Sequence, residues 1–223
     1  MIADQLINYM IPPLKPTDDI DRARQWMDEF RVKELPVIEK SRLLGFISED
    51  ILYDSVIVHT EVGAYPLMGQ SCIVMPWTHY YDILKVQSEH NMDMVSVVEN
   101  DQFKGIVLKD DILKEFAKTA IVNATGAIVA LQTTLDNYSL SEITRIVEMN
   151  GSTVLGANVK PDSDDHSLLE IVLRINHQDV YQISNGLSKT FLLVVATVIF
   201  QSCFSNVFKN FKIEVNIKTI NAI

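Results

Sequence analysis

The sequence predicts an α+β fold made of a duplicated unit followed by a second domain with a different order of elements. Residues 35–52 and 95–112 align without a gap at an offset of 60 residues, which places Gly45 over Gly105. A repeat of this length indicates duplicated structural units. Beyond Gly126 the repeat ends and a new succession of strand and helix signals begins.

Each copy is expected to contain a strand, a helix, two strands and a second helix, over about 1–58 and 71–120. The first helix is indicated by apolar residues at helical spacing, which are Ile20, Ala23, Met27 and Phe30 in the first copy. Thr17 is expected to cap this helix in the first copy and Thr78 in the second.

The two strands of each copy are the extended runs on either side of a short polar turn. They are expected at 35–39, 43–48, 95–99 and 103–108. The second helix then begins at Asp50 in the first copy and at Asp110 in the second, where acidic side chains complement the positive end of a helix.

The second domain, 126–204, is expected to run strand, helix, strand, strand, helix, strand. Its strands are predicted at 127–135, 153–160, 168–176 and 191–200. The first helix has Ser139 as its cap, Glu142 as the capping-box partner and Gly151 as its stop, and the second helix covers 179–189. This order builds an antiparallel sheet with both helices on one face.

The C-terminal extension, 205–223, alternates apolar and polar residues. The apolar positions are Phe211, Ile213, Val215 and Ile217. Alternation of this kind is typical of a strand, because successive side chains point to opposite faces of a sheet. We therefore expect an additional edge strand or a strand that pairs with a partner chain.

Composition excludes several classes of protein. A formal charge of -10 opposes binding to the phosphate backbone of nucleic acid. The longest apolar stretch, Phe191–Phe200, is shorter than the roughly 20 residues that cross a bilayer as a helix, so no membrane partner is expected. Cys72 and Cys203 stand alone, which predicts neither a disulfide framework nor a zinc site and favours a cytoplasmic location.

The duplicated unit, 1–122, resembles the CBS domain pair, also called a Bateman module. The resemblance lies in LPVIE followed by GFISED in the first copy, and in VSVVE followed by GIVLKDDIL in the second. The element order of 126–204 resembles the ferredoxin-like fold of ACT regulatory domains. Together they are similar to bacterial acetoin-utilisation-like CBS proteins, and the fold class expected is tandem CBS domains plus an ACT-type domain.

The resemblance implies a site for an adenine nucleotide. In that family a Ser or Thr donates to phosphate, and an Asp three residues later accepts hydrogen bonds from ribose hydroxyls. In this chain each copy keeps one member of the pair. The first copy has Ser48 but Ile51 in place of the Asp, and the second has Asp111 but Leu108 in place of the Ser or Thr. Loss of one charge-assisted hydrogen bond costs about one to two decades of affinity. The implied regulatory ligands are AMP, ADP, ATP or S-adenosylmethionine, and no cofactor is obligatory.

Seven residues are predicted to line the ligand clefts: Ser48, Asp111, Pro36, Ser96, Gly45, Gly105 and Met75. Structural roles remain open for several of them. Ser48 and Asp111 stand at strand-to-helix junctions, where helix caps need the same residue types. Gly45 and Gly105 suit a turn or close strand packing. Met75 precedes an aromatic cluster that would either pack against the ring of a ligand or form part of the hydrophobic core.

The function predicted is that of a non-catalytic regulatory protein. As a homodimer it would sense a small-molecule effector in the CBS cleft and relay the signal through the ACT-like domain or the dimer interface. The alternative is a ligand-independent oligomerisation or scaffold module with degenerate clefts. An enzyme is not expected, since the sequence contains no Ser-His-Asp spacing, Gly-rich phosphate loop or metal triad.

Overall fold

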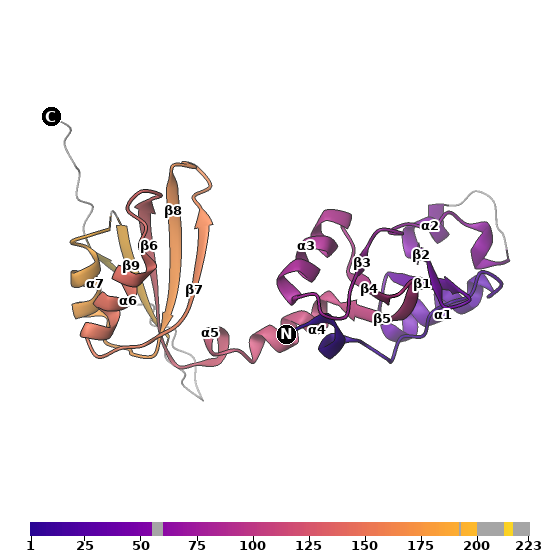
Figure 1. The fold of residues 1–223 in the computed structure, drawn as a ribbon, viewed down its shortest axis with the longest axis horizontal. Coiled ribbons are helices and arrows are strands. Elements are labelled where there is room, and N and C mark those ends of the chain that lie inside the picture. The colour runs from indigo at the N-terminus through magenta and orange to yellow at the C-terminus, as the bar shows by residue number, and fades with distance from the viewer. Residues whose placement is uncertain (55–59, 192, 200–211, 216–223) are drawn as a thin grey trace. The chain divides into compact units, whose positions relative to one another are not determined.

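The computed structural model describes residues 1–54, 60–191, 193–199 and 212–215. The chain forms two compact units, Met1–Phe116 and Ala117–Ile223 (Figure 1). The predicted boundary, between 122 and 126, lies a few residues beyond this division. In the described part of the chain, no helix is long and apolar enough to span a bilayer.

The first unit contains two copies of one arrangement. The first copy holds η1 (Ala3–Leu6), α1 (Ile20–Phe30), β1 (Glu34–Glu39), β2 (Arg42–Ser48) and α2 (Glu49–Asp54). The second holds η2 (Val62–Ala64), β3 (Ile73–Val74), α3 (Tyr80–His90), β4 (Met94–Glu99), β5 (Gln102–Leu108) and α4 (Lys109–Ala117). The predicted order of strand, helix, strand, strand and helix is confirmed in the second copy.

The two copies differ in their leading strand. In the second copy β3 pairs in parallel with β4, whereas in the first copy this pairing shrinks to a single bridge between Leu14 and Val37. The hairpins β1–β2 and β4–β5 are antiparallel, and each contains a register shift directly after Val37 or Val97. The offset of 60 residues is thus preserved in the details of strand pairing.

The predicted caps of the two first helices were wrong. Helix α1 begins after Asp19, whose carboxylate accepts the N–H of Asp21 at 2.8 Å. Helix α3 begins after His79, whose Nδ1 accepts the N–H of Tyr81 at 3.4 Å. Thr78 instead accepts the N–H of Met75 through Oγ1 at 3.0 Å, which tightens the turn that precedes the helix.

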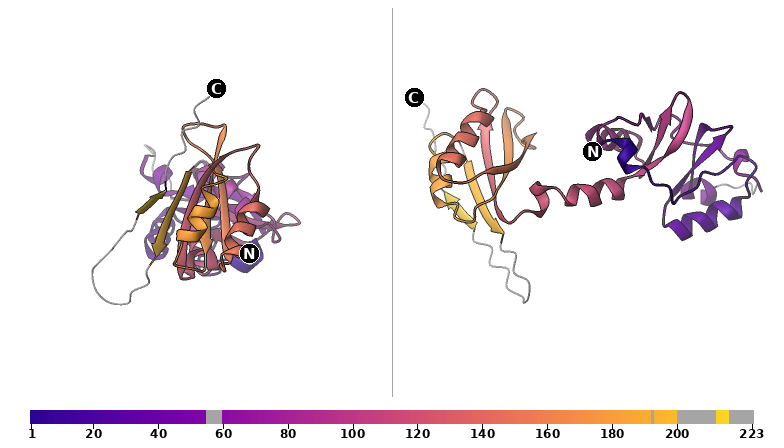
Figure 2. Two further views of the ribbon diagram at one scale, coloured as in Figure 1. Left: turned by 90° about the vertical axis from the view of Figure 1, so that its left-hand side faces the viewer. Right: turned by 60° about the horizontal axis from the view of Figure 1, so that its bottom comes forward.

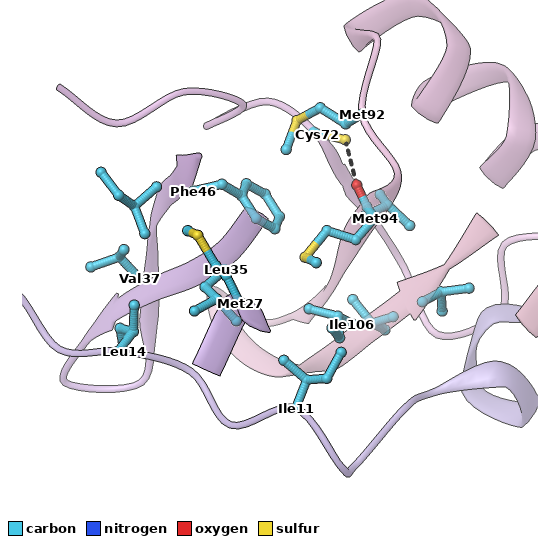
Figure 3. Packing of buried hydrophobic residues seen from close by; sticks show 14 of the residues in the cluster. Ile11, Leu14, Met27, Leu35, Val37, Phe46, Cys72, Met92, Met94 and Ile106 are labelled. Atoms are coloured by element: carbon cyan, nitrogen blue, oxygen red, sulfur yellow. Dashed lines mark hydrogen bonds between the residues drawn. The ribbon is translucent and has the colours of Figure 1, made fainter. Parts of the chain in front are cut away.

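Both copies contribute to one hydrophobic core. Val37 and Phe46 come from the first hairpin, Met94 and Ile106 come from the second, and all four are buried in the same cluster (Figure 3). The apolar faces of the two hairpins cover each other and so exclude water. Neither copy could bury this surface alone. The duplicated unit therefore folds as a pair.

The segment that leads to the first helix of each copy crosses to the hairpin of the other copy. The N–H of Asn8 donates to the carbonyl of Ile106 at 2.8 Å, so residues near the N-terminus lie along β5. In the equivalent exchange, Met68 and Phe46 bond reciprocally at 2.8 and 2.9 Å. The crossing segments link the two copies through backbone hydrogen bonds.

The second unit is a five-stranded antiparallel sheet with helices. Its elements are α5 (Ala120–Asn123), β6 (Gly126–Thr134), α6 (Leu140–Met149), β7 (Val154–Pro161), β8 (Leu168–Ile175), α7 (Tyr181–Leu187), β9 (Leu193–Ile199) and β10 (Lys212–Val215). The strand order is β10-β9-β6-β8-β7. Apart from the short α5, which precedes the first strand, the predicted succession of strands and helices is confirmed.

Helices α6 and α7 cover one face of this sheet, as the sequence predicts (Figure 2). Ile143 of α6 and Ile183 of α7 are buried with Val129 of β6 and Leu173 of β8 in one cluster. Alternate residues of the strands supply this core because side chains of a strand point to opposite faces in turn. The second unit thus has a core of its own.

The predicted cap Ser139 and the predicted stop Gly151 of α6 are confirmed, whereas the Glu142 side chain, predicted as the capping-box partner, bonds to Arg145. The Ser139 hydroxyl accepts the N–H of Glu142 at 3.3 Å, and Gly151 follows the helix with a φ of 74°. The Glu142 carboxylate forms an ion pair with Arg145 at 2.6 Å. In the C-terminal extension, β10 pairs with β9, which confirms the predicted edge strand. Phe211, Ile217, Cys203 and the predicted domain end at 204 lie outside the described residues.

Candidate functional site

Gly45 and Gly105 lie where the crossing segments press against β2 and β5. A Cβ atom at Gly105 would stand 2.5 Å from Cγ2 of Ile7, and one at Gly45 would stand 2.8 Å from the carbonyl oxygen of Met68. Their φ angles are +155° and +142°, which side-chain-bearing residues rarely adopt. Both glycines therefore allow close backbone packing, which is one of the two roles left open by the sequence.

Asp111 is held by contacts from two segments that are far apart in sequence. It lies in the first turn of α4, and its Oδ2 accepts a hydrogen bond from Nδ2 of Asn8 at 2.8 Å. Its Oδ1 accepts a hydrogen bond from Nζ of Lys114 at 3.0 Å, and this contact raises the pKa of Lys114. The amide oxygen of Asn8 accepts the N–H of Met10 at 2.9 Å. Asn8 thereby connects the N-terminal segment to α4.

A hollow of about 470 Å³ opens beside Asp111. Its lining consists of Gln5, Leu6, Ile7, Asn8, Tyr9, Met10, Asp111, Lys114 and Glu115. This volume falls in the range of small-molecule sites. A carboxylate offers about four acceptor positions, and since Asn8 and Lys114 occupy two, the remainder can receive hydroxyl donors from a ligand.

The equivalent place in the first copy has different chemistry. Ile51 stands where the second copy has Asp111, and Met68 stands where it has Asn8. The hydroxyl of Ser48 is buried and accepts the N–H of Ile51 at 3.3 Å, so Ser48 caps α2. An apolar pair thus replaces the hydrogen-bonded Asn–Asp pair.

Side chains of the protein also fill space near this first copy. Gly69 corresponds to Tyr9 at the offset of 60, and a Cβ atom there would stand 2.4 Å from Sδ of Met92. Met92 is fully buried beside Phe46 (Figure 3). Methionine fills irregular space well because its chain is unbranched and flexible. The two copies are therefore unequal as binding sites.

The remaining predicted site residues lie away from the Asp111 hollow. Pro36 and Ser96 are buried at equivalent places in β1 and β4, and their backbones bind Leu14 and Cys72. The hydroxyl of Ser96 has no hydrogen-bond partner among the described residues. Met75 is 54% exposed in the turn before α3. Of the seven predicted residues, Asp111 is the one that lines this hollow.

The aromatic cluster that follows Met75 divides between the core and the surface. Tyr80 is buried, whereas Trp77 and Tyr81 are exposed. Trp77 borders a second hollow of about 430 Å³, lined by Ile2, Asp4, Ile7, Tyr9, Pro76, Trp77, Glu99 and Lys104. The two hollows share Ile7 and Tyr9. The N-terminal segment consequently separates two adjoining depressions.

A buried carboxyl group joins the two copies and was not singled out by the sequence. Glu34, at the start of β1, is 7% exposed, and one of its carboxyl oxygens has no hydrogen-bond partner among the described residues. Burial and the negative charge of Asp93 raise the pKa of Glu34 to about 7. Burial and the charge of Glu34 raise the pKa of Cys72 to about 12.

Comparison with known proteins gives no matching family model. Among solved structures, a CBS domain pair/ACT domain protein from Thermotoga maritima has 18% identity and a TM-score of 0.48, covering 53% of this chain and 98% of that one. The CBS domains of a transcriptional regulator from Streptococcus pneumoniae have 18% identity and a TM-score of 0.45, covering 51% and 98%. CBSX2 in complex with AMP has 19% identity and a TM-score of 0.46, covering 52% and 96%. The solved structures that this chain resembles are CBS domain pair proteins.

Proposed function

We propose that this chain is a non-catalytic, cytoplasmic regulatory protein that binds one adenine nucleotide or derivative per chain, in the hollow beside Asp111. The observation that carries the proposal is the Asp111 carboxylate, oriented by Asn8 and Lys114 at the wall of a hollow of about 470 Å³. The resemblance of the duplicated sequence to CBS domain pairs supports this class of ligand.

The lining suits a ligand with a sugar and a flat ring. The free acceptor positions of Asp111 match the hydroxyl donors of a ribose. Tyr9 and Met10 border the same hollow with exposed side chains, and aromatic and thioether groups pack favourably on ring faces. Polar and apolar contacts would therefore come from the two elements that form the hollow.

One ligand per chain follows from the difference between the copies. Ile51 and Met68 have apolar side chains where the second copy has the carboxylate of Asp111 and the amide of Asn8. Ser48, the residue that the family pattern would use for phosphate, lacks the Asp three residues later, because Ile51 stands there. The first copy supplies packing to the pair, and the second supplies the site.

The signal would leave the site through α4. This helix carries Asp111 and Lys114 and ends at Ala117, where the second unit begins. A ligand that favours one position of α4 relative to the N-terminal segment would shift the equilibrium between two arrangements. The ferredoxin-like, ACT-type assignment of the second unit belongs to this proposal and gives the signal a receiving domain.

Calorimetry tests the proposal. The full chain is titrated with AMP, ADP, ATP and S-adenosylmethionine, and at least one is expected to bind with a stoichiometry of one. Asp111→Asn should weaken binding by about one to two decades, because a charge-assisted hydrogen bond is lost. Glu29→Gln, on the exposed face of α1 and outside the lining of the hollow, is the control and should leave affinity unchanged. Failure of all four ligands at millimolar concentration would exclude the nucleotide function.

The alternative function is ligand-independent oligomerisation. It is favoured by β10, which is the outermost strand of its sheet and pairs with β9 on one side only among the described residues. Such an edge offers unpaired backbone groups to a second chain. Light scattering would compare the full chain with one that ends at Gln201; a dimer in the first and a monomer in the second would place the interface at the C-terminal strand.

A further inference from the structure

The hollow of about 430 Å³ that Trp77 borders contains none of the charged residues that line the proposed nucleotide site. Backbone hydrogen bonds hold its walls together. The N–H of Asp4 donates to the carbonyl of Pro76 at 2.8 Å, and the N–H of Ala3 donates to the carbonyl of Thr78 at 2.9 Å. These bonds fix Asp4 beside the turn that carries Trp77. The two side chains therefore border one hollow before any ligand binds.

The first copy repeats this backbone arrangement with a different residue in the place of Asp4. There the N–H of Gly63 donates to the carbonyl of Pro16 at 2.8 Å, which is the counterpart of the bond between Asp4 and Pro76. A Cβ atom at Gly63 would stand 2.8 Å from Cβ of Pro16, so that position has no room for a side chain. The duplicated backbone is thus built without a carboxylate in the first copy. The fold does not require the carboxylate of Asp4.

The two aromatic residues of the hollow are also peculiar to the second half of the duplication. At the offset of 60, Thr17 corresponds to Trp77 and Gly69 corresponds to Tyr9. Trp77 is 62% exposed and Tyr9 is 79% exposed, so neither ring contributes much to the core. Large aromatic side chains gathered on a surface mark a site of interaction more often than a structural need. The first copy shows that the same backbone forms without them.

The charged groups of the hollow leave one carboxylate available. Glu99 and Lys104 form an ion pair at 3.3 Å, so their charges largely cancel. Asp4 is exposed, and its carboxylate makes no hydrogen bond or ion pair with the residues that the structure describes. Aromatic rings attract cations because their faces are electron-rich. A cation without hydrogen-bond donors suits a hollow with two rings and a single available carboxylate, and a formal charge of -10 on the chain adds to the attraction.

We propose that this hollow binds a small organic cation with an alkylated ammonium group. The cation would contact the carboxylate of Asp4 and the rings of Trp77 and Tyr9, while its carbon atoms would contact Ile2 and Pro76. The volume falls in the range of small-molecule sites. Because the three recognition groups are exposed to solvent, an affinity on the order of 1 mM is expected. The site is separate from the nucleotide site, and its occupation does not depend on that function.

Fluorescence of Trp77 tests the site in the full chain carrying Trp26→Phe, because this substitution leaves Trp77 as the single tryptophan. The probes are choline and tetramethylammonium, each added at constant ionic strength. The uncharged comparison is dimethylbutanol, in which a carbon atom replaces the nitrogen of choline. Both cations should change the emission saturably, and dimethylbutanol should bind at least fivefold more weakly than choline. Equal affinity for choline and dimethylbutanol would overturn the proposal, as would the absence of a saturable change with both cations.

Calorimetry with choline measures the contribution of each side chain. Trp77→Thr places the residue of the first copy in the turn and should reduce binding below detection. Asp4→Asn should weaken binding about two- to fivefold, the size of one exposed contact between charges. Asp28→Asn, which removes an exposed carboxylate of α1 outside the lining, is the control and should bind choline as the wild type does. Wild-type affinity in either Trp77→Thr or Asp4→Asn would overturn the proposal.

Discussion

Replacement of Glu34 by Gln should remove a pH-dependent loss of stability from the first unit. The carboxyl group of Glu34 has a pKa of about 7 in the folded chain, against an ordinary value of 4.5. The folded state therefore holds this proton more tightly than the unfolded state. The contribution of Glu34 to stability is fully present below pH 4.5 and is lost as the pH rises through 7, because the folded chain must then bury a negative charge.

The size of the effect follows from the change in pKa. A rise from 4.5 to about 7 corresponds to at most about 3 kcal/mol, and screening by the solvent that still reaches this group reduces it to about 2 kcal/mol. The groups that face Glu34 are the charged pair Asp93 and Lys109, joined at 2.7 Å, and the thiol of Cys72. The Asp93 charge raises the Glu34 pKa and the Lys109 charge lowers it, while burial makes the largest contribution.

The assay is urea unfolding of wild type and Glu34→Gln at pH 5 and pH 8, followed by tryptophan fluorescence. Trp26 and Trp77 are the two tryptophans of the chain, and both lie in the first unit, so the signal reports on that unit. The free energy of unfolding of Glu34→Gln, compared with that of wild type, should be about 2 kcal/mol more favourable at pH 8 than at pH 5.

The matched control is Glu39→Gln at the exposed end of the same strand, which should follow the wild-type pH profile. This control also accounts for other groups that titrate in the same range. Parallel pH profiles for wild type and Glu34→Gln would refute the reasoning, because they would mean that Glu34 keeps an ordinary pKa in the folded chain.

Three further outcomes are expected. Gly105→Ala should destabilise the first unit by about 1–3 kcal/mol because its Cβ meets Ile7, and Ile7→Ala should recover part of that loss; strictly additive costs in the double variant would speak against the contact. In a Cys203→Ser background, Cys72 should react with a disulfide reagent at pH 8 only as fast as the first unit opens, since burial keeps the thiol protonated; rapid labelling of the folded chain would contradict this. Ser139→Ala should lower the stability of the second unit by about 1 kcal/mol through loss of the α6 cap, and an unchanged calorimetric transition would argue against it.

Local signals predicted an element well where the deciding contacts lie close in sequence. The ends of α6 depend on Ser139 and Gly151, which act on the adjacent turn of the helix. The caps of α1 and α3 were predicted at the wrong residues for the opposite reason. Asp19 and His79 each carry a side-chain acceptor that bonds the first helical turn, and each forms a bridge to a distant segment, to Glu61 and Ile2 respectively. Those bridges determine where each helix begins.

The candidate site shows the same division. Asp111 was predicted from the resemblance to the CBS pattern, whose residues lie close together in sequence. Asn8 was not predicted, because it lies 103 residues from Asp111 in the sequence. Its side chain nevertheless orients the Asp111 carboxylate. The offset alignment contained a usable signal, since Asn8 corresponds to Met68 and Asp111 corresponds to Ile51. A polar pair that is replaced by an apolar pair in the other copy suggests that the two positions meet.

Periodicity and short motifs were sufficient to predict the duplicated unit and the succession of elements in both units, because such patterns report on neighbouring residues. Tertiary structure alone decided which segment faces Asp111, which copy retains an open hollow and how deeply Glu34 is buried. These properties depend on the crossing of each preceding segment to the other hairpin. Contacts between residues so distant in the chain are set by packing of the whole unit, and no local pattern encodes them.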